Sequence, residues 1–116
     1  MGRTLARLTL TLLVVSALAA PAAAGPRLHR PAARATERAR IVDFSFRPKR
    51  IEVDRRTRVR WVNAGGVAHT VTSASGLWDS GSIAPGETFG RVFRQAGTFR
   101  FRCSIHPSMT GRVVVT

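Results

Sequence analysis

The chain has 116 residues, of which 19 are Lys or Arg and 6 are Asp or Glu, so its formal charge is +13 at neutral pH. Such a charge favours anionic partners, but the sequence carries no nucleic-acid-binding motif, and we predict no nucleic-acid partner. Cys103 is the one cysteine, which excludes an internal disulfide. The length allows one small domain, which we expect to be a monomer that needs a further source of stability.

The first 24 residues are typical of a secretory signal peptide. Arg3 and Arg7 precede an apolar run over 8–20, and three alanines at 22–24 form a cleavage site. The alternative is a membrane anchor, but the run is shorter than the roughly 20 apolar residues that a span needs. We therefore predict a signal peptide over 1–24, cleaved after Ala24, and an exported protein that is periplasmic or extracellular, in the cell envelope.

The segment 25–40 is rich in Ala, Arg and Pro and has almost no large apolar residue. We interpret it as a flexible basic linker. The alternative is a short helix over 32–40, but that helix would have no apolar face with which to dock. His29 in this segment is interpreted as a solvated residue.

From Ile41 onward, short β-type runs alternate with Gly, Pro and Asn, a pattern that predicts an all-β domain over 41–116. The pattern shows no convincing helix. We expect seven or eight strands, each with one apolar face, in a compact two-sheet sandwich. The runs cover 41–46, 50–53, 58–63, 68–73, 88–94, 98–103 and 111–116.

Alternation along these runs predicts which side chains face the core. Arg91 is the exception, because it shares parity with Phe89 and Phe93. Either Gly90 marks a β-bulge or Arg91 lies at a sheet edge, and the pattern leaves both open. The predicted inward residues are Val42, Phe44, Phe46, Val59, Trp61, Phe99, Phe101 and Cys103.

The stretch C-S-I-H-P-S-M places Cys103, His106 and Met109 within seven residues. Pro107 disfavours a helix at the preceding residue, so the three side chains are predicted to lie on one tight loop. His69, which opens another predicted strand, is the candidate for a fourth ligand. Each residue alone is weak evidence, because a lone Cys or Met is more often part of a core. Together they offer a thiolate, a thioether and two imidazoles, a set that suits copper better than zinc.

Three stretches carry a family resemblance: F-R-C-S-I-H-P-S-M-T-G-R-V-V-V, N-A-G-G-V-A-H-T-V-T and D-S-G-S-I-A-P-G-E-T-F. They resemble the cupredoxins, the blue copper proteins, and within them the plastocyanin and amicyanin group. The short Cys-x2-His-x2-Met loop with Pro after the His is similar to that of amicyanins in particular. The resemblance covers 41–116.

The resemblance implies a Greek-key β-sandwich with one type 1 copper ion. His69, Cys103 and His106 would be its equatorial ligands and Met109 the long axial ligand. It further implies a carrier of single electrons between redox partners rather than an enzyme. Given the basic surface, we expect those partners to dock through acidic surfaces. The resemblance places an apolar patch around His106, formed by Val67, Ala68, Pro85, Ile105 and Pro107.

The sequence departs from the family pattern at three places. Thr70 follows the first ligand His where many members have Asn, which leaves open how the two ligand loops are tied together. Phe101 replaces the usual Tyr two residues before the Cys, and the turn at 54–56 lacks the frequent Gly.

Two other functions stay open. One is a copper-binding protein for storage or delivery in the cell envelope, and the other is a metal-free interaction module. The positive charge also suits association with an anionic envelope surface.

Overall fold

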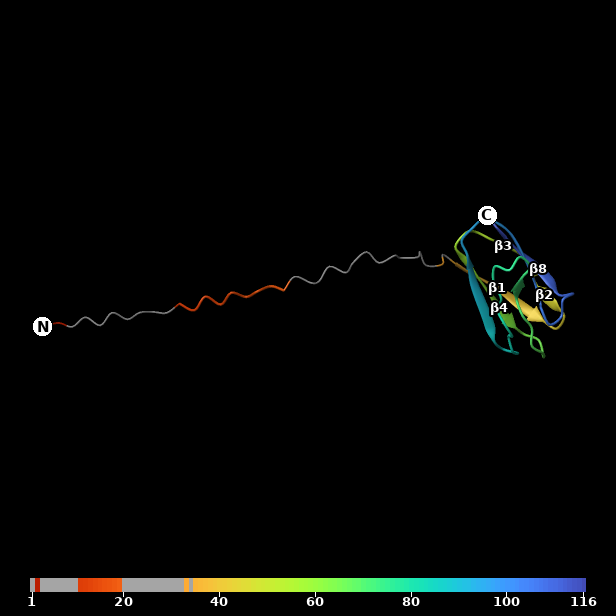
Figure 1. Ribbon diagram of the computed structural model, residues 1–116, viewed down its shortest axis with the longest axis horizontal. Helices are drawn as coiled ribbons and strands as arrows, with labels where there is room; N and C mark the ends of the chain where they lie inside the picture. Colours follow the sequence, from red (N-terminus) through yellow and green to blue (C-terminus); the bar gives the residue numbers. More distant parts are fainter. Residues whose placement is uncertain (1, 3–10, 20–32, 34) are drawn as a thin grey trace.

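In the computed structural model, which describes residues 2, 11–19, 33 and 35–116, two four-stranded sheets pack face to face (Figure 1). The first has the strand order β2-β1-β4-β6 and the second β3-β8-β7-β5. The pairs β1–β4 and β3–β8 are parallel and the others antiparallel. The strands are β1 (Ala35–Val42), β2 (Ser45–Arg47), β3 (Arg50–Val53), β4 (Thr57–Asn63), β5 (Thr72–Ser73), β6 (Thr88–Phe93), β7 (Gly97–Arg102) and β8 (Thr110–Val115).

This arrangement confirms the predicted all-β Greek-key sandwich, because successive strands cross repeatedly between the two sheets. The described residues contain no helix, and therefore none long and apolar enough to cross a membrane. Most of the predicted signal peptide, 1–24, and of the linker up to residue 34 lies outside those residues.

The first strand begins earlier than the sequence predicted. β1 starts at Ala35, within the segment interpreted as a linker over 25–40, and pairs with β4 from Ala35 opposite Thr57 to Ile41 opposite Asn63. Of the β1 residues before Ile41, Ala39 alone is buried, so the apolar alternation is too short to recognise. The strand forms because the edge of β4 supplies hydrogen-bond partners to any backbone laid beside it.

The predicted strand over 41–46 is two strands joined by a turn at Asp43–Phe44. Phe44 has a φ of 68° and is 66% exposed, so the prediction that it faces the core is wrong. The prediction for Phe46 is confirmed, because it is buried, whereas Ile41 is buried in place of Val42, which is half-buried. The turn separates two short alternating patterns, so a single continuous alternation does not describe both strands.

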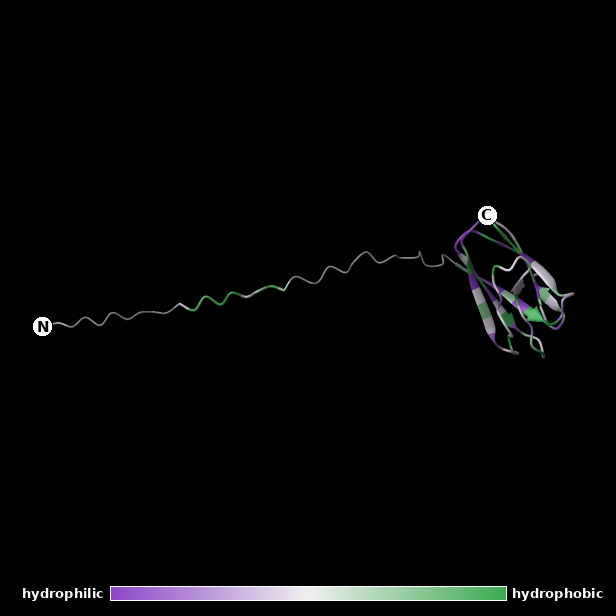
Figure 2. Ribbon diagram, viewed as in Figure 1, coloured by the Kyte–Doolittle hydropathy of each residue, from purple (hydrophilic) through white to green (hydrophobic). Residues whose placement is uncertain are grey.

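Trp61 lies at the centre of the core. Its ring contacts Phe89, Phe93 and Phe101 at centroid distances of 6.0, 6.4 and 5.3 Å. Phe101 thus keeps a packing role without a hydroxyl group. The predicted inward positions on β4 and β7 are confirmed, because Val59, Trp61 and Phe101 are buried. Along the strands, hydrophobic and hydrophilic residues alternate as this packing requires (Figure 2).

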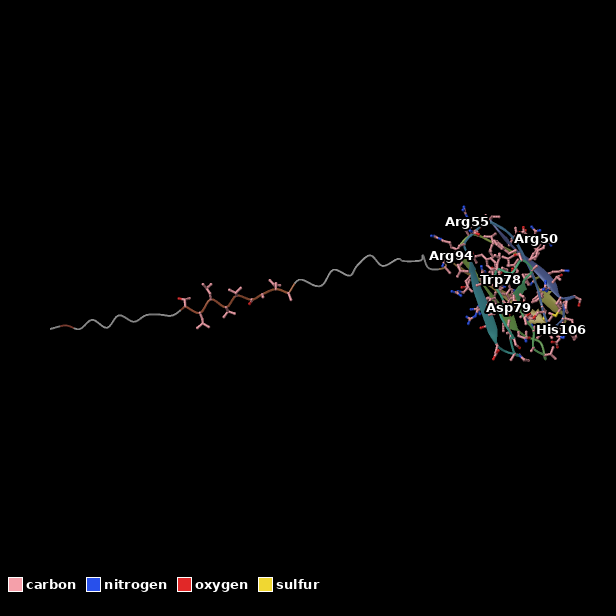
Figure 3. All side chains as sticks on the ribbon, viewed as in Figure 1. Arg50, Arg55, Trp78, Asp79, Arg94 and His106 are labelled. Atoms are coloured by element: carbon pink, nitrogen blue, oxygen red, sulfur yellow. The ribbon has the colours of Figure 1, made fainter. Side chains whose placement is uncertain are left out.

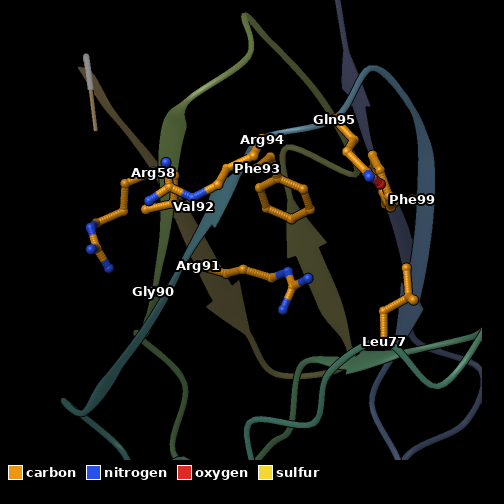
Figure 4. Close-up of a pocket in the computed structure, with 9 residues that line it drawn as sticks. All are labelled: Arg58, Leu77, Gly90, Arg91, Val92, Phe93, Arg94, Gln95 and Phe99. Atoms are coloured by element: carbon orange, nitrogen blue, oxygen red, sulfur yellow. The ribbon is translucent and has the colours of Figure 1, made fainter. Parts of the chain in front are cut away.

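The position of Arg91 shows that the sheet edge, not a bulge, explains its parity. The pairing of β6 with β4 runs without interruption through Gly90, and β6 is an outer strand of its sheet. At this open side, a hollow lined by Arg91, Phe93 and Phe99 leaves room for the guanidinium (Figure 4). The guanidinium carbon lies 4.7 Å from the ring centroid of Trp78, a cation–π contact that lets a charge face inward.

Candidate metal centre

Three of the predicted ligands meet at one end of the sandwich. The ligand atoms of His69, Cys103 and His106 all lie within 4.8 Å of one another. Cys103 Sγ is 3.9 Å from His69 Nδ1 and 3.8 Å from His106 Nδ1. His69 and Cys103 are fully buried, whereas His106 is half-buried. The two imidazoles therefore present the same ring nitrogen to one sulfur.

Met109 belongs to the same loop, which follows β7. The Cys103 N–H donates to the carbonyl of Met109 over 3.0 Å, and the Met109 N–H donates to the carbonyl of His106 over 2.9 Å. These two bonds close the segment 103–109 into a tight loop, as predicted from the position of Pro107. Met109 is 2% exposed, so its thioether is enclosed by the protein rather than by water.

The backbone around His69 bonds to neighbouring loops instead of pairing with a strand. His69 forms a bridge with Ile83, the Thr70 N–H donates to Cys103 Sγ over 3.3 Å, and the Val71 N–H donates to Ser80 Oγ over 2.8 Å. These backbone groups are thus engaged outside a sheet ladder. For this reason the strand predicted over 68–73 is reduced to β5.

Thr70, which stands where many family members have Asn, connects the two ligand loops. Its hydroxyl oxygen accepts a bond from the Ser104 N–H over 2.7 Å and lies 3.0 Å from Ser104 Oγ. Together with the bond from its own N–H to the sulfur, this ties the His69 loop to the Cys103 loop. Thr70 therefore performs the bridging for which the family pattern uses Asn.

The environment of Cys103 favours a thiolate. Burial raises the pKa of its thiol, but hydrogen bonds from the backbone N–H groups of Thr70 and His106, followed by the side-chain contacts with the His69 and His106 rings, outweigh burial. The pKa falls from 9.0 to about 6. The sulfur is thus a ready metal ligand at neutral pH, because metals bind the thiolate rather than the thiol.

Sequence reasoning missed three residues that support this centre. Asn63, fully buried at the end of β4, donates to the carbonyls of Val67 and Ile83, which fixes the loop before His69. Asp43 and Phe44, in the turn after β1, contact the two imidazoles. The Asn63-Ala-Gly-Gly sequence after a strand is a turn signal that points to the first residue. No local signal identifies the other two, because the contacts join distant segments.

Asp43 contacts the ring of His69, and Phe44 meets the rings of both His69 and His106 edge-on. Asp43 Oδ1 lies 3.1 Å from His69 Nε2, and the ring of Phe44 meets that of His106 edge-on at 5.2 Å. The backbone N–H of Gly66, and next the imidazole of His69, hold the pKa of Asp43 below its ordinary value. A carboxylate behind a ligand imidazole is a frequent arrangement in metal sites.

The donor set fits copper. It combines one thiolate with two imidazoles at short range, and the enclosed thioether lies on the same loop. Soft sulfur ligands with imidazoles are the set of electron-transferring copper centres, whereas zinc gains little from a thioether.

The comparisons with known proteins agree with this centre. The model of the cupredoxin-like domain family matches residues 8–115. Amicyanin-alpha of Methylorubrum extorquens is 27% identical over 105 residues, covering 86% of this chain and 88% of its own sequence.

Among solved structures, the purple cupredoxin of Nitrosopumilus maritimus superposes with a TM-score of 0.64 at 27% identity, covering 68% of this chain and 98% of that one. A reduced amicyanin variant superposes with a TM-score of 0.67 at 22% identity, covering 70% and 82%, and supports the fold. Because the family model spans nearly the whole chain, the protein belongs to the cupredoxin family of copper-binding domains.

Proposed function

We propose that this protein carries single electrons between redox partners by means of one type 1 copper ion. His69, Cys103 and His106 would be its equatorial ligands and Met109 its axial ligand. The observation that carries the proposal is the convergence of two imidazoles on one buried cysteine sulfur at 3.8 and 3.9 Å. Copper, when bound, supplies a Cu(II)/Cu(I) couple that accepts one electron from a reduced partner and passes it to an oxidised one.

The surroundings of these residues suit a carrier because they limit movement. The ligand loops are joined through Thr70 and Ser104, and the loop before His69 is fixed by Asn63. A site that changes little between oxidation states reorganises little, which favours fast transfer. No catalytic group is needed for such a function, which agrees with a carrier rather than an enzyme.

We infer that electrons enter or leave through His106. It is the half-buried ligand, while His69 and Cys103 are fully buried. Phe44, Val67 and Ile105 are 66, 44 and 49% exposed, large fractions for apolar side chains. Phe44 contacts the His106 ring directly, and it joins the predicted patch of Val67, Ala68, Pro85, Ile105 and Pro107.

A row of arginines supports partners with acidic docking surfaces. Arg50, Arg112 and Arg100 stand opposite one another across β3, β8 and β7, on the face of the second sheet that points away from the core. Like charges in directly opposed positions destabilise a sheet, so the row favours a role in binding. Glu52 pairs with Arg50 and offsets part of this charge. A hollow on this face is lined by the three arginines together with Lys49 and Arg102.

One experiment separates a carrier from a storage or delivery protein. The copper-loaded, reduced protein is mixed with hexacyanoferrate(III), an anionic one-electron oxidant, in the presence of a Cu(I) chelator. We expect rapid oxidation over repeated cycles with the copper retained. Transfer of Cu(I) to the chelator faster than oxidation would instead indicate delivery.

The same reaction tests the arginine row. For the native protein, we expect the rate to fall as salt is added, because ions screen the attraction. Arg100→Ser and Arg112→Ser should lower both the rate and its salt dependence. Arg55→Ser, which removes the same charge from the turn between β3 and β4, is the matched control. Equal effects of all three variants would show that net charge matters and the row does not.

Export remains a prediction from the sequence. The apolar run and the alanines before Gly25 support it, and copper would then be loaded after export. The mass of the mature protein tests it, since cleavage after Ala24 leaves a chain beginning at Gly25, whereas an intact N-terminus would contradict the proposal.

A further inference from the structure

The turn between β1 and β2 places a carboxylate behind His69. Asp43 Oδ1 lies 3.1 Å from Nε2 of the ring, while Nδ1 of the same ring lies 3.9 Å from Cys103 Sγ. The His69 side chain is fully buried, and that of Asp43 is 41% exposed. One ring nitrogen therefore faces the sulfur and the other faces a charged group at the surface.

The backbone is shaped to hold this carboxylate. The Gly66 N–H donates to both oxygens of Asp43, over 3.1 and 3.0 Å. At Gly65, an added Cβ would lie 2.2 Å from Asp43 Oδ1, so only glycine leaves room for the carboxylate. Phe44, the next residue after Asp43, has a φ of 68°, a left-handed conformation that is unfavourable for a residue with a side chain. Strain of this kind persists where the surrounding structure requires it.

The carboxylate determines which nitrogen of His69 carries the proton. An ionised carboxylate accepts hydrogen bonds and donates none, so the bond to Asp43 requires the proton on Nε2. The lone pair then lies on Nδ1, the nitrogen nearest Cys103. This is the nitrogen that a metal beside the sulfur would use.

We propose that Asp43 is a positioning residue of the copper centre, which holds His69 with Nδ1 free for the metal and adds a negative charge that favours Cu(II) over Cu(I). The inference rests on the proposed function. It deepens that function, because it makes the β1–β2 turn a determinant of the reduction potential. Asp43 acts through His69 and is not itself a proposed ligand.

The test is the reduction potential of Asp43→Asn. Asn keeps an oxygen that can accept from Gly66 and His69 but removes the charge, so a purely structural role predicts no change. We expect the affinity for Cu(II) relative to Cu(I) to fall roughly tenfold, which raises the potential by about 59 mV.

Two further variants control for structure and for net charge. Gly65→Ala keeps the carboxylate but displaces it, and should also raise the potential. Asp54→Asn removes an equal charge from the turn between β3 and β4. Arg55, the residue next to Asp54, lies at the end of the sandwich opposite to the ligand His106 (Figure 3). This variant should leave the potential unchanged. The proposal is wrong if Asp43→Asn shifts the potential no more than Asp54→Asn does.

A measurement on the metal-free protein separates this inference from the copper function. Nitrogen NMR of the native protein reports which nitrogen of His69 is protonated, whether or not copper is later bound. We expect the proton on Nε2, and Asp43→Ala should weaken that preference. A proton on Nδ1 in the native protein would overturn the inference even if the protein carries electrons. A failure of electron transfer alone would leave this readout intact.

Discussion

Cys103 and the two histidines owe their closeness to residues with no metal-binding chemistry of their own. Thr70 bonds to two successive residues of the Cys103 loop: its N–H donates to the Cys103 sulfur, and its hydroxyl accepts from the N–H of Ser104. The grouping of Cys103, His106 and Met109 could be predicted from the sequence because one short loop contains all three. The contacts of Asp43 and Phe44 could not, because they depend on a turn within a segment that the alternating pattern predicted to be one strand.

Thr70→Val should weaken the connection between the two ligand loops. The change keeps the shape of the side chain but removes the hydroxyl that accepts from the Ser104 N–H over 2.7 Å. We expect a loss of about 1 kcal/mol in the free energy of unfolding of the metal-free protein. Hydrogen exchange at the Ser104 amide should become faster, whereas Thr70→Ser, which keeps the hydroxyl, should preserve its protection. Equal exchange in the two variants would contradict the assigned bond.

At the level of the elements, β1 and β5 mark where sequence patterns were insufficient. β4 and β7 were predicted well because their apolar residues alternate over several positions. β1 is formed by pairing with β4 rather than by its own apolar residues, and β5 is short because backbone groups near His69 bond elsewhere. Both differences arise from long-range contacts that no local pattern records.

The strand assignment before Ile41 can be tested with one residue type at two neighbouring positions. Ala39 is 1% exposed and lies opposite Trp61, whereas Arg38 is exposed. Ala39→Asn should lower the free energy of unfolding by about 2 kcal/mol or more, because it buries an amide in a packed site. Arg38→Asn should change it by less than about 0.5 kcal/mol. Urea denaturation measures both, and equal tolerance would instead fit the flexible linker predicted for 25–40.

For the whole molecule, the sandwich brings together residues that are 34 positions apart in the chain, since His69 and Cys103 come from different loops. A metal bound to both residues would link the two loops, which lowers the entropy of the unfolded chain and so stabilises the folded state. The fold class and all four proposed ligands were predicted from the sequence, because their spacing and the family resemblance agreed. The supporting carboxylate and the arginine row required the three-dimensional pairing of strands.

The visible absorption spectrum of the Cu(II)-loaded protein tests the copper centre most directly. If Cys103 binds copper together with His69, His106 and Met109, thiolate-to-copper charge transfer should give an intense blue colour, and Cys103→Ala should abolish it. A colourless native complex, or a colour that survives in Cys103→Ala, would contradict the assignment.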